Sequence, residues 1–203
     1  MRLVIVPLIM ICLLLFPLSG HTRPIAPLEG LEALSRGFSG ISDFTAEITQ
    51  EKRLSIMKRN LVSNGTIRFK KPELFMLEIR SPYESRLLLR DNIIEQTVAR
   101  EKDHSRIVLP PEQGLKQWFA KLTGSIGSLP EGTGVRADLN GSLYTLWISP
   151  GGKGQVKELT ISFQNDGVIR RLIIDERNGD RATMTFRKVR RNTGLTEKDF
   201  RLE

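Results

Sequence analysis

The feature that most constrains this chain is a long succession of short strand-like segments. Apolar and polar residues alternate along 44–49, FTAEIT, and similar segments follow it towards the C-terminus. A period of two is typical of a half-buried β-strand. We predict about eleven strands on this basis: 44–56, 62–70, 74–79, 86–90, 93–99, 105–109, 135–139, 143–149, 155–163, 168–176 and 182–190.

The residues between these segments favour tight turns rather than crossover helices. Asn140-Gly141 and Asn165-Asp166-Gly167 are typical of hairpins. Because no helix follows each strand, the sheet should be antiparallel, and a long meander tends to curl on itself. The sequence therefore predicts a mainly β fold with some α, an incomplete antiparallel β-barrel with helices covering its open mouth.

Two helices are expected as those covers. The first lies within 24–42, where leucines recur at helical spacing until Gly37 and Gly40 end it. The second lies within 111–127, where Leu115, Trp118, Phe119 and Leu122 stand at i, i+3, i+4 and i+7.

The N-terminus has the layout of a secretory signal peptide. Arg2 precedes an apolar run, 3–16, and the chain turns polar after Gly20. The run is shorter than the ~20 residues of a spanning helix. We therefore predict a signal peptide over 1–22, with cleavage between 20 and 24, and a single domain over 23–203. An uncleaved membrane anchor is the alternative.

Export restricts the chemistry that the mature chain can use. Cys12 is the single cysteine and lies within the apolar run, so no disulfide or thiol is expected after cleavage. His104 lies in a charged segment, EKDHSR, which we interpret as a solvated turn. Neither a metal-ligand spacing nor a phosphate-binding loop is present, since SPGGKG at 149–154 lacks the required Lys-Ser/Thr. The sequence indicates a protein that is not an enzyme and has no cofactor.

The net charge of +8 favours contact with anionic surfaces. A basic segment with an aromatic residue, 177–192, could in principle meet nucleic acid, but an exported protein does not encounter it in the cell. We interpret this segment as a solvated strand face, or as a face that meets an anionic membrane.

One predicted strand is unusual because large apolar residues occupy both of its faces. This strand, LFMLEI at 74–79, follows the turn Lys71-Pro72. A strand with one solvated face would alternate with polar residues. We expect one of its faces to line a cavity and the other to pack elsewhere in the protein, for example under a helix.

The order of motifs resembles the LolA family of periplasmic lipoprotein carriers over nearly the whole mature chain. The matching pieces in the first half are FTAEITQEKR, NGTIRFKKPELFMLEIRSP and SRLLLRDN. The closing strands, from LYTLWISP to the late Phe200, are also similar. Each motif alone is weak, whereas their order and spacing are fairly specific.

The resemblance implies a half-barrel that carries acylated cargo from the inner to the outer membrane. It implies a lipoprotein or other acylated lipid as cargo, an inner-membrane exporter complex, an outer-membrane acceptor, and a periplasmic monomer in a Gram-negative bacterium. In that family a basic residue before the Pro, and the Phe after it, matter for transfer. They correspond to Lys71 and Phe75.

Two departures from the family suggest a divergent member. Classical carriers have Arg where this chain has Lys71, and Lys cannot form the planar two-pronged contact that Arg makes. The chain also stops shortly after Phe200, without the classical C-terminal extension. The cargo could therefore be a glycolipid or another specialised lipid.

The predicted lipid-binding residues come from the sheet and from the second helix. A carrier needs an apolar cavity, because each CH₂ removed from water is worth about 0.8 kcal/mol. The predicted lining residues are Ile67, Phe69, Lys71, Phe75, Leu77, Ile79, Trp118, Phe119 and Leu122. The alternative for each apolar residue is an ordinary core position. A lipid-sensing regulatory module and a purely structural periplasmic domain remain the competing functions.

Overall fold

A single curved antiparallel sheet dominates the computed structural model. The structure describes residues 22–57, 59–99, 103–111, 114–116, 132–152 and 154–202. The elements at the two ends of the chain are β1 (Arg23–Ile25), α2 (Pro27–Ser39) and a 3-10 turn, η2 (Glu197–Asp199). The remaining strands are β2 (Asp43–Arg53), β3 (Leu61–Lys70), β4 (Leu74–Ser81), β5 (Ser85–Arg90), β6 (Ile93–Val98), β7 (Asp103–Val108), β8 (Gly134–Asn140), β9 (Leu143–Ser149), β10 (Val156–Gln164), β11 (Ile169–Glu176) and β12 (Arg181–Arg191).

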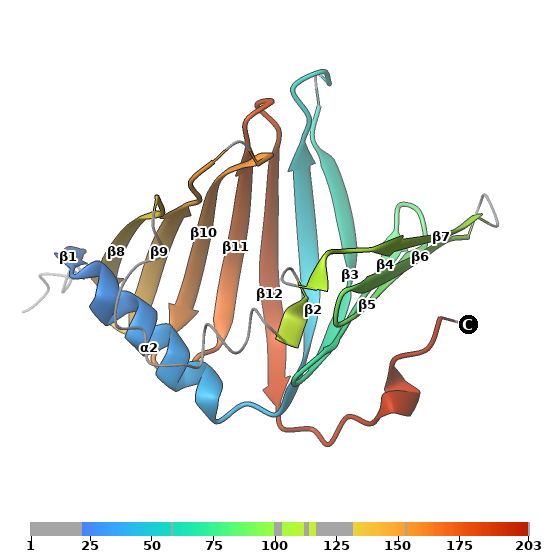
Figure 1. The fold of residues 1–203 in the computed structure, drawn as a ribbon, viewed down its shortest axis with the longest axis horizontal. Helices are drawn as coiled ribbons and strands as arrows, with labels where there is room; N and C mark the ends of the chain where they lie inside the picture. The colour runs from blue at the N-terminus through green and yellow to red at the C-terminus, as the bar shows by residue number, and fades with distance from the viewer. Residues whose placement is uncertain are drawn as a thin grey trace, which may run out of the picture.

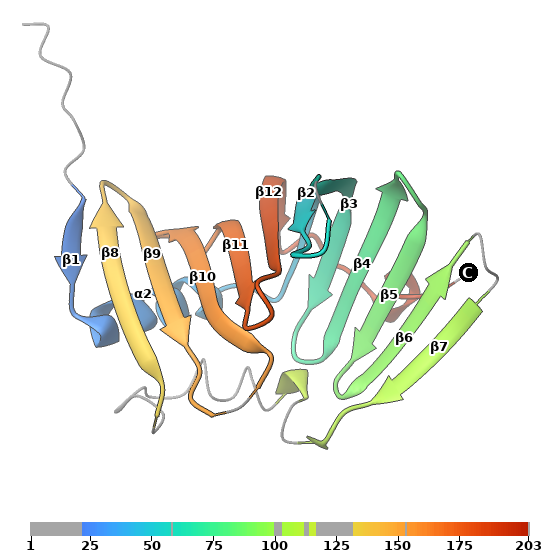
Figure 2. The same cartoon turned by 90° about the horizontal axis from the view of Figure 1, so that it is seen from above.

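The sheet has twelve strands in the order β1-β8-β9-β10-β11-β12-β2-β3-β4-β5-β6-β7. Every described pairing is antiparallel. β1 and β7 stand at opposite ends of the order and do not pair, so the sheet stays open, as Figures 1 and 2 show. The expected incomplete barrel is confirmed.

Two details of the predicted strands are wrong. The first strand, β1, was not predicted: it pairs with β8 through Arg23–Ile25 and overlaps the beginning of the range, 24–42, within which the first helix was expected. Its proline is tolerated because β1 is an edge strand and need not donate on both sides. His104 was expected in a turn but lies in β7 opposite Thr97, because pairing with β6 extends the strand back to Asp103.

Helix α2 lies against one face of the sheet, which we call the inner face. Pro27 begins it, where the missing N–H has no cost, and it packs mainly on β8 and β9. Leu31, Leu34 and Phe38 are buried against sheet residues that include Leu146 and Phe163. The helical periodicity is therefore confirmed.

The end of α2 differs from the expectation at one glycine. Gly40 is the C-cap residue, as predicted, but Gly37 lies inside the helix. A Cβ on Gly37 would stand 2.4 Å from the Cα of Gly167. Gly37 is thus explained by close backbone contact with the β10–β11 turn, not by helix termination.

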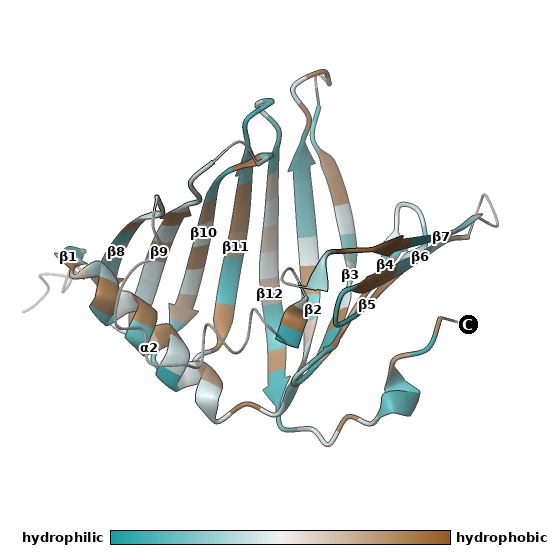
Figure 3. Ribbon diagram, in the orientation of Figure 1, coloured by the Kyte–Doolittle hydropathy of each residue, from teal (hydrophilic) through white to brown (hydrophobic). Residues whose placement is uncertain are grey.

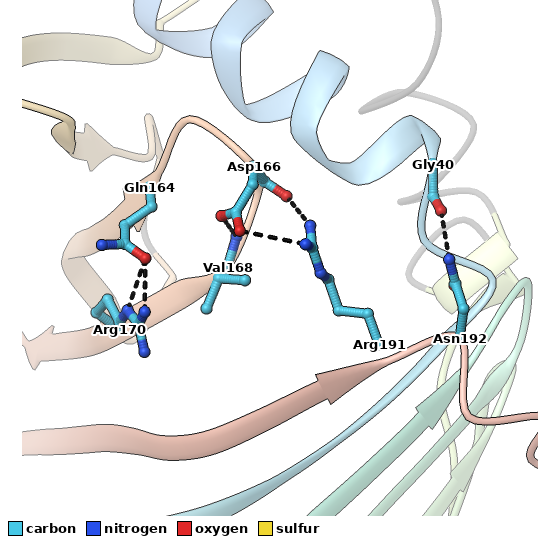
Figure 4. A network of polar contacts seen from close by, with 7 residues as sticks. All are labelled: Gly40, Gln164, Asp166, Val168, Arg170, Arg191 and Asn192. Carbon is cyan, nitrogen blue, oxygen red and sulfur yellow. Dashed lines mark hydrogen bonds and ion pairs between the residues drawn. The ribbon is translucent and has the colours of Figure 1, made fainter.

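The segment after β12 turns around the start of β2. The buried carboxylate of Asp43 accepts hydrogen bonds from the Thr193 N–H and hydroxyl, at 2.7 and 2.8 Å, and from the Gly194 N–H at 3.2 Å. The Asn192 side chain donates to the Gly40 carbonyl at 3.0 Å (Figure 4). These bonds join the end of α2, the start of β2 and the C-terminal segment.

A second set of polar contacts fixes the β10–β11 turn beneath α2. Arg191 donates to the Asp166 carbonyl oxygen at 2.5 Å and pairs with its carboxylate at 3.2 Å (Figure 4). Asp166 also accepts from the Val168 N–H at 3.1 Å. The turn that touches Gly37 is therefore held from β12.

No helix in the described part of the chain is long and apolar enough to cross a membrane. Residues 1–21 lie outside the described residues. The signal peptide and the single domain over 23–203 stay predictions.

Candidate functional site

The two apolar faces of β4 have different surroundings. Leu74 and Met76 are buried on the outer face, opposite α2, in a cluster with Leu88 and Phe200. The C-terminal segment, not a helix of regular length, covers this face, since Leu195 and Leu202 also pack there. One apolar face of the strand LFMLEI is therefore covered by the protein's own C-terminal segment.

The inner face of β4 carries Phe75, Leu77 and Ile79, which are half-buried. They pack against a buried cluster that includes Ile48, Ile67 and Phe186. The strand register of β5, β6 and β7 places further apolar side chains beside them on the same face. We call the whole set the inner apolar row: Phe75, Leu77, Ile79, Leu87, Leu89, Ile94 and Ile107.

The inner apolar row lies on the half of the sheet away from α2. Figure 3 shows strongly apolar segments among the overlapping strands β4 to β7 there. Ile107, at the edge strand, is 54% exposed, and the other members are only partly buried. Half-buried aliphatic and aromatic side chains on adjacent strands form a surface that suits hydrocarbon.

Sequence reasoning missed the part of this row beyond β4. The run RLLLR at 86–90 was recognised as a strand, but its inward residues, Leu87 and Leu89, were not assigned to the site. The signal was available, because the pairs Leu77–Leu87 and Phe75–Leu89 follow once the β4–β5 hairpin register is known.

Ile67 and Phe69 lie nearer to the core than the inner apolar row. Their side chains are 1% and 3% exposed. The Phe69 ring centroid lies 5.3 Å from that of Phe44, and Phe69 belongs to the buried cluster that includes Phe38 of α2. In this conformation both residues pack within the protein, and their contact with a lipid stays a prediction.

Lys71 connects the β3–β4 turn with the C-terminal end of α2. Its Nζ donates a hydrogen bond to the Phe38 carbonyl oxygen and lies 3.5 Å from the Ser39 carbonyl oxygen. Its N–H donates to the Ser42 carbonyl at 2.9 Å. Burial lowers the pKa of the Lys71 ammonium. A cation at this place satisfies carbonyls that the last helical turn leaves unpaired.

The remaining predicted residues, Trp118, Phe119 and Leu122, lie outside the described residues. Leu115, which starts the predicted second helix, is described and packs against the α2 cluster. Its N–H donates to the Asp91 carbonyl at 3.2 Å. The predicted lid residues therefore stay predictions.

The outer face of the same strands offers a different kind of surface. A groove of about 660 Å³ lies there, lined by residues that include Arg68, Glu78, Arg86 and His104. Glu78 pairs with Arg68 at 2.8 Å and with Arg86 at 3.5 Å. Charged walls of this kind do not suit an acyl chain, which would leave the ions without solvent.

The fold and the site together define a LolA-like open half-barrel: a curved antiparallel sheet with a helix on its inner face and an apolar row beside it. The chain belongs to the LolA family, whose model, described as outer membrane lipoprotein carrier protein LolA, matches residues 39–203. The family resemblance seen in the sequence is confirmed.

Three similar proteins share 9–25% of their residues with this chain. An outer-membrane lipoprotein carrier protein from Hahella chejuensis is 25% identical over 187 residues, covering 88% of this chain and 86% of the relative. A DUF1329 family protein from Desulfovibrio piger is 12% identical, with a TM-score of 0.49, covering 87% of this chain and 98% of that one. A LolA superfamily protein from Nitrosomonas europaea is 9% identical, with a TM-score of 0.46, covering 88% and 98%.

Proposed function

We propose that this protein is a periplasmic carrier that shelters acyl chains of a lipoprotein or related lipid on the inner apolar row. The observation that carries the proposal is the unequal treatment of the two apolar faces of β4. Met76, on the outer face, is sealed by Phe200, whereas Phe75 and Leu77 on the inner face remain half-exposed. A contiguous row of half-exposed apolar side chains on one face is typical of a ligand-binding or interaction surface.

Membership of a family of lipoprotein carriers supports the same function. In the proposal, the inner-membrane exporter loads the carrier and an outer-membrane acceptor unloads it. The sequence carries no nucleotide-binding motif, so transfer would run on differences in affinity between donor, carrier and acceptor. The carrier would act as a monomer and without a cofactor.

Acyl-chain binding would draw its free energy from the hydrophobic effect. A bound chain that buries ten methylenes would gain on the order of 8 kcal/mol before the costs of ordering it. Binding would also remove the half-exposed side chains of the inner apolar row from water. Such binding is not selective for the headgroup, which leaves a glycolipid as an alternative cargo.

A matched pair of variants tests the proposal. Ile107 and Val108 are neighbours on β7 and are 54% and 61% exposed, but their register places them on opposite faces. Ile107→Glu puts a charge on the inner apolar row, and Val108→Glu puts it on the outer face. Uptake of a fluorescent fatty acid should fall about tenfold for Ile107→Glu and stay unchanged for Val108→Glu.

Native mass spectrometry of the purified protein gives the complementary measurement, since co-purifying acyl species would report the cargo directly. Phe75→Glu, on β4 at the end of the row nearest the buried clusters, should show the same loss of fatty acid more strongly. Equal uptake by both β7 variants, or a wild-type protein that takes up no fatty acid, would rule the proposal out.

A further inference from the structure

The turn between β2 and β3 presents two large apolar side chains to solvent. Ile56 is 91% exposed and Met57 is 42% exposed. They lie at the tip of a long hairpin, which projects at the upper edge of the sheet in Figure 1. A single exposed aliphatic residue is ordinary, but two adjacent ones at a projecting tip form a defined apolar contact point.

The turn is braced, so these side chains are presented outward. The Ser55 N–H donates to the Asp180 carboxylate in the β11–β12 turn at 2.7 Å. The Met57 N–H donates to the Leu54 carbonyl at 3.0 Å, and Asn60 donates to the carboxylate of Glu51. Asp180 and Glu51 thus both help to hold the turn.

Cations surround the apolar tip. Lys52 and Arg53 precede it and Arg59 follows it, and all three are exposed. Within the described residues none of them forms an ion pair. An apolar tip with free cations just behind it matches a bilayer surface, where hydrocarbon lies beneath anionic phosphates.

The position of the tip determines which edge of the sheet would face the bilayer. Because adjacent strands are antiparallel, the β2–β3 and β4–β5 turns lie at one edge, and the latter carries the exposed Tyr83. Tyrosine is enriched at membrane interfaces. Lys71 and the end of α2 lie at the opposite edge. A bilayer that touches the tip would therefore face the edge of the sheet that carries the β2–β3 and β4–β5 turns, and not the edge that carries the end of α2.

We propose that the β2–β3 turn docks this protein on anionic phospholipid, with Ile56 and Met57 entering the headgroup–acyl boundary and Lys52, Arg53 and Arg59 meeting phosphates. This contact goes beyond the carrier function and does not depend on a bound cargo. It gives the protein an affinity for the bilayer itself, in addition to any protein partner in the membrane.

Co-sedimentation with vesicles tests the docking site. The protein is used from residue 22 onward, where the described fold begins, so that the apolar N-terminal run cannot bind by itself. Wild type should bind vesicles of phosphatidylethanolamine and phosphatidylglycerol, and bind phosphatidylcholine vesicles at least tenfold more weakly. The double variant Ile56→Ser/Met57→Ser should bind the anionic vesicles about tenfold more weakly than wild type.

Two control variants test whether vesicle binding is specific to the β2–β3 turn and whether it depends on the cations beside it. Val108→Ser removes an apolar side chain that is also exposed but lies at the opposite edge of the sheet, and it should bind vesicles as wild type does. Lys52→Gln/Arg53→Gln should lower binding to anionic vesicles and weaken its dependence on salt. Fatty acid uptake in solution should be normal for all these variants, which separates this proposal from the carrier function.

The docking proposal is overturned if wild type does not bind the protein-free vesicles, or if the double variant at Ile56 and Met57 binds them as tightly as wild type. Binding only to membranes that contain a protein partner would likewise overturn it, because the recognition would then be by protein.

Discussion

Met76 and Phe200 are buried in one cluster on the outer face of β4, each 1% exposed, although they lie in distant parts of the chain. The C-terminal segment therefore acts as part of the core. Its path is fixed by the hydrogen bonds between Asp43 and residues 193–194. This arrangement leaves the inner face of the same strand as the accessible apolar surface.

Removing the Phe200 ring should destabilise the protein strongly. Phe200→Ala leaves a cavity beside Met76 and Leu88, and we expect the free energy of unfolding to fall by about 3–5 kcal/mol. Urea unfolding measures the change. Leu202→Ala, at a partly exposed position that packs on the same cluster, should cost less. A loss below 1 kcal/mol for Phe200→Ala would mean that the segment contributes little to the core.

Lys71 should hold the end of α2 against the β3–β4 turn. Lys71→Met removes the donor to the Phe38 carbonyl, and we expect a loss of about 1 kcal/mol with faster amide exchange in the last turn of α2. Lys71→Arg keeps a donor and a charge and should retain most of the protection. Unchanged exchange in Lys71→Met would show that the contact does not restrain the helix.

Asp43 should make the stability depend on pH in acid. Burial alone would raise the pKa of its carboxyl, but hydrogen bonds from Thr193, Gly194 and Ser42 outweigh it and lower the pKa below 3.8. Because the folded-state pKa is the lower one, the stabilisation is complete above the unfolded-state pKa and is lost as the pH falls through the folded-state pKa.

Asp43→Asn removes this dependence. The amide NH₂ would face backbone donors, and we expect a loss of about 2 kcal/mol near pH 7. The difference in unfolding free energy between wild type and Asp43→Asn, measured from pH 7 down to 3, should shrink below about pH 4. A difference that stays constant over this range would contradict the role given to the carboxylate.

Gly37 and Gly40 provide a matched test of how closely α2 approaches the sheet. Gly37→Ala gains about 1 kcal/mol of helix propensity, yet its Cβ would overlap the backbone of Gly167. We expect a net loss of about 1–3 kcal/mol. A Cβ on Gly40 meets nothing within 4 Å, so Gly40→Ala should change stability by less than about 0.5 kcal/mol. Thermal unfolding of the two variants, compared with wild type, shows whether Gly37 is needed for the close contact with Gly167 or for ending the helix.

Much of the fold follows from local patterns in the sequence. The period-two segments predict the strands from β2 to β12, and the turn residues between them predict antiparallel pairing. β1 was not predicted because three residues are too few to show a periodicity. Its formation depends on pairing with β8, which is more than a hundred residues away in the sequence. His104 was misassigned for a similar reason, since pairing with Thr97 overrides the charged character of its segment.

The sequence by itself determined the open β architecture, the apolar character of both faces of β4 and membership of a carrier family. Only the tertiary structure decided which face of β4 is sealed, because Phe200 reaches Met76 through a turn anchored at Asp43. It also assigned Lys71 to the end of α2 and extended the apolar surface to Ile107. These relationships join residues distant in sequence, and local pattern carries no information about which distant partner occupies a given face.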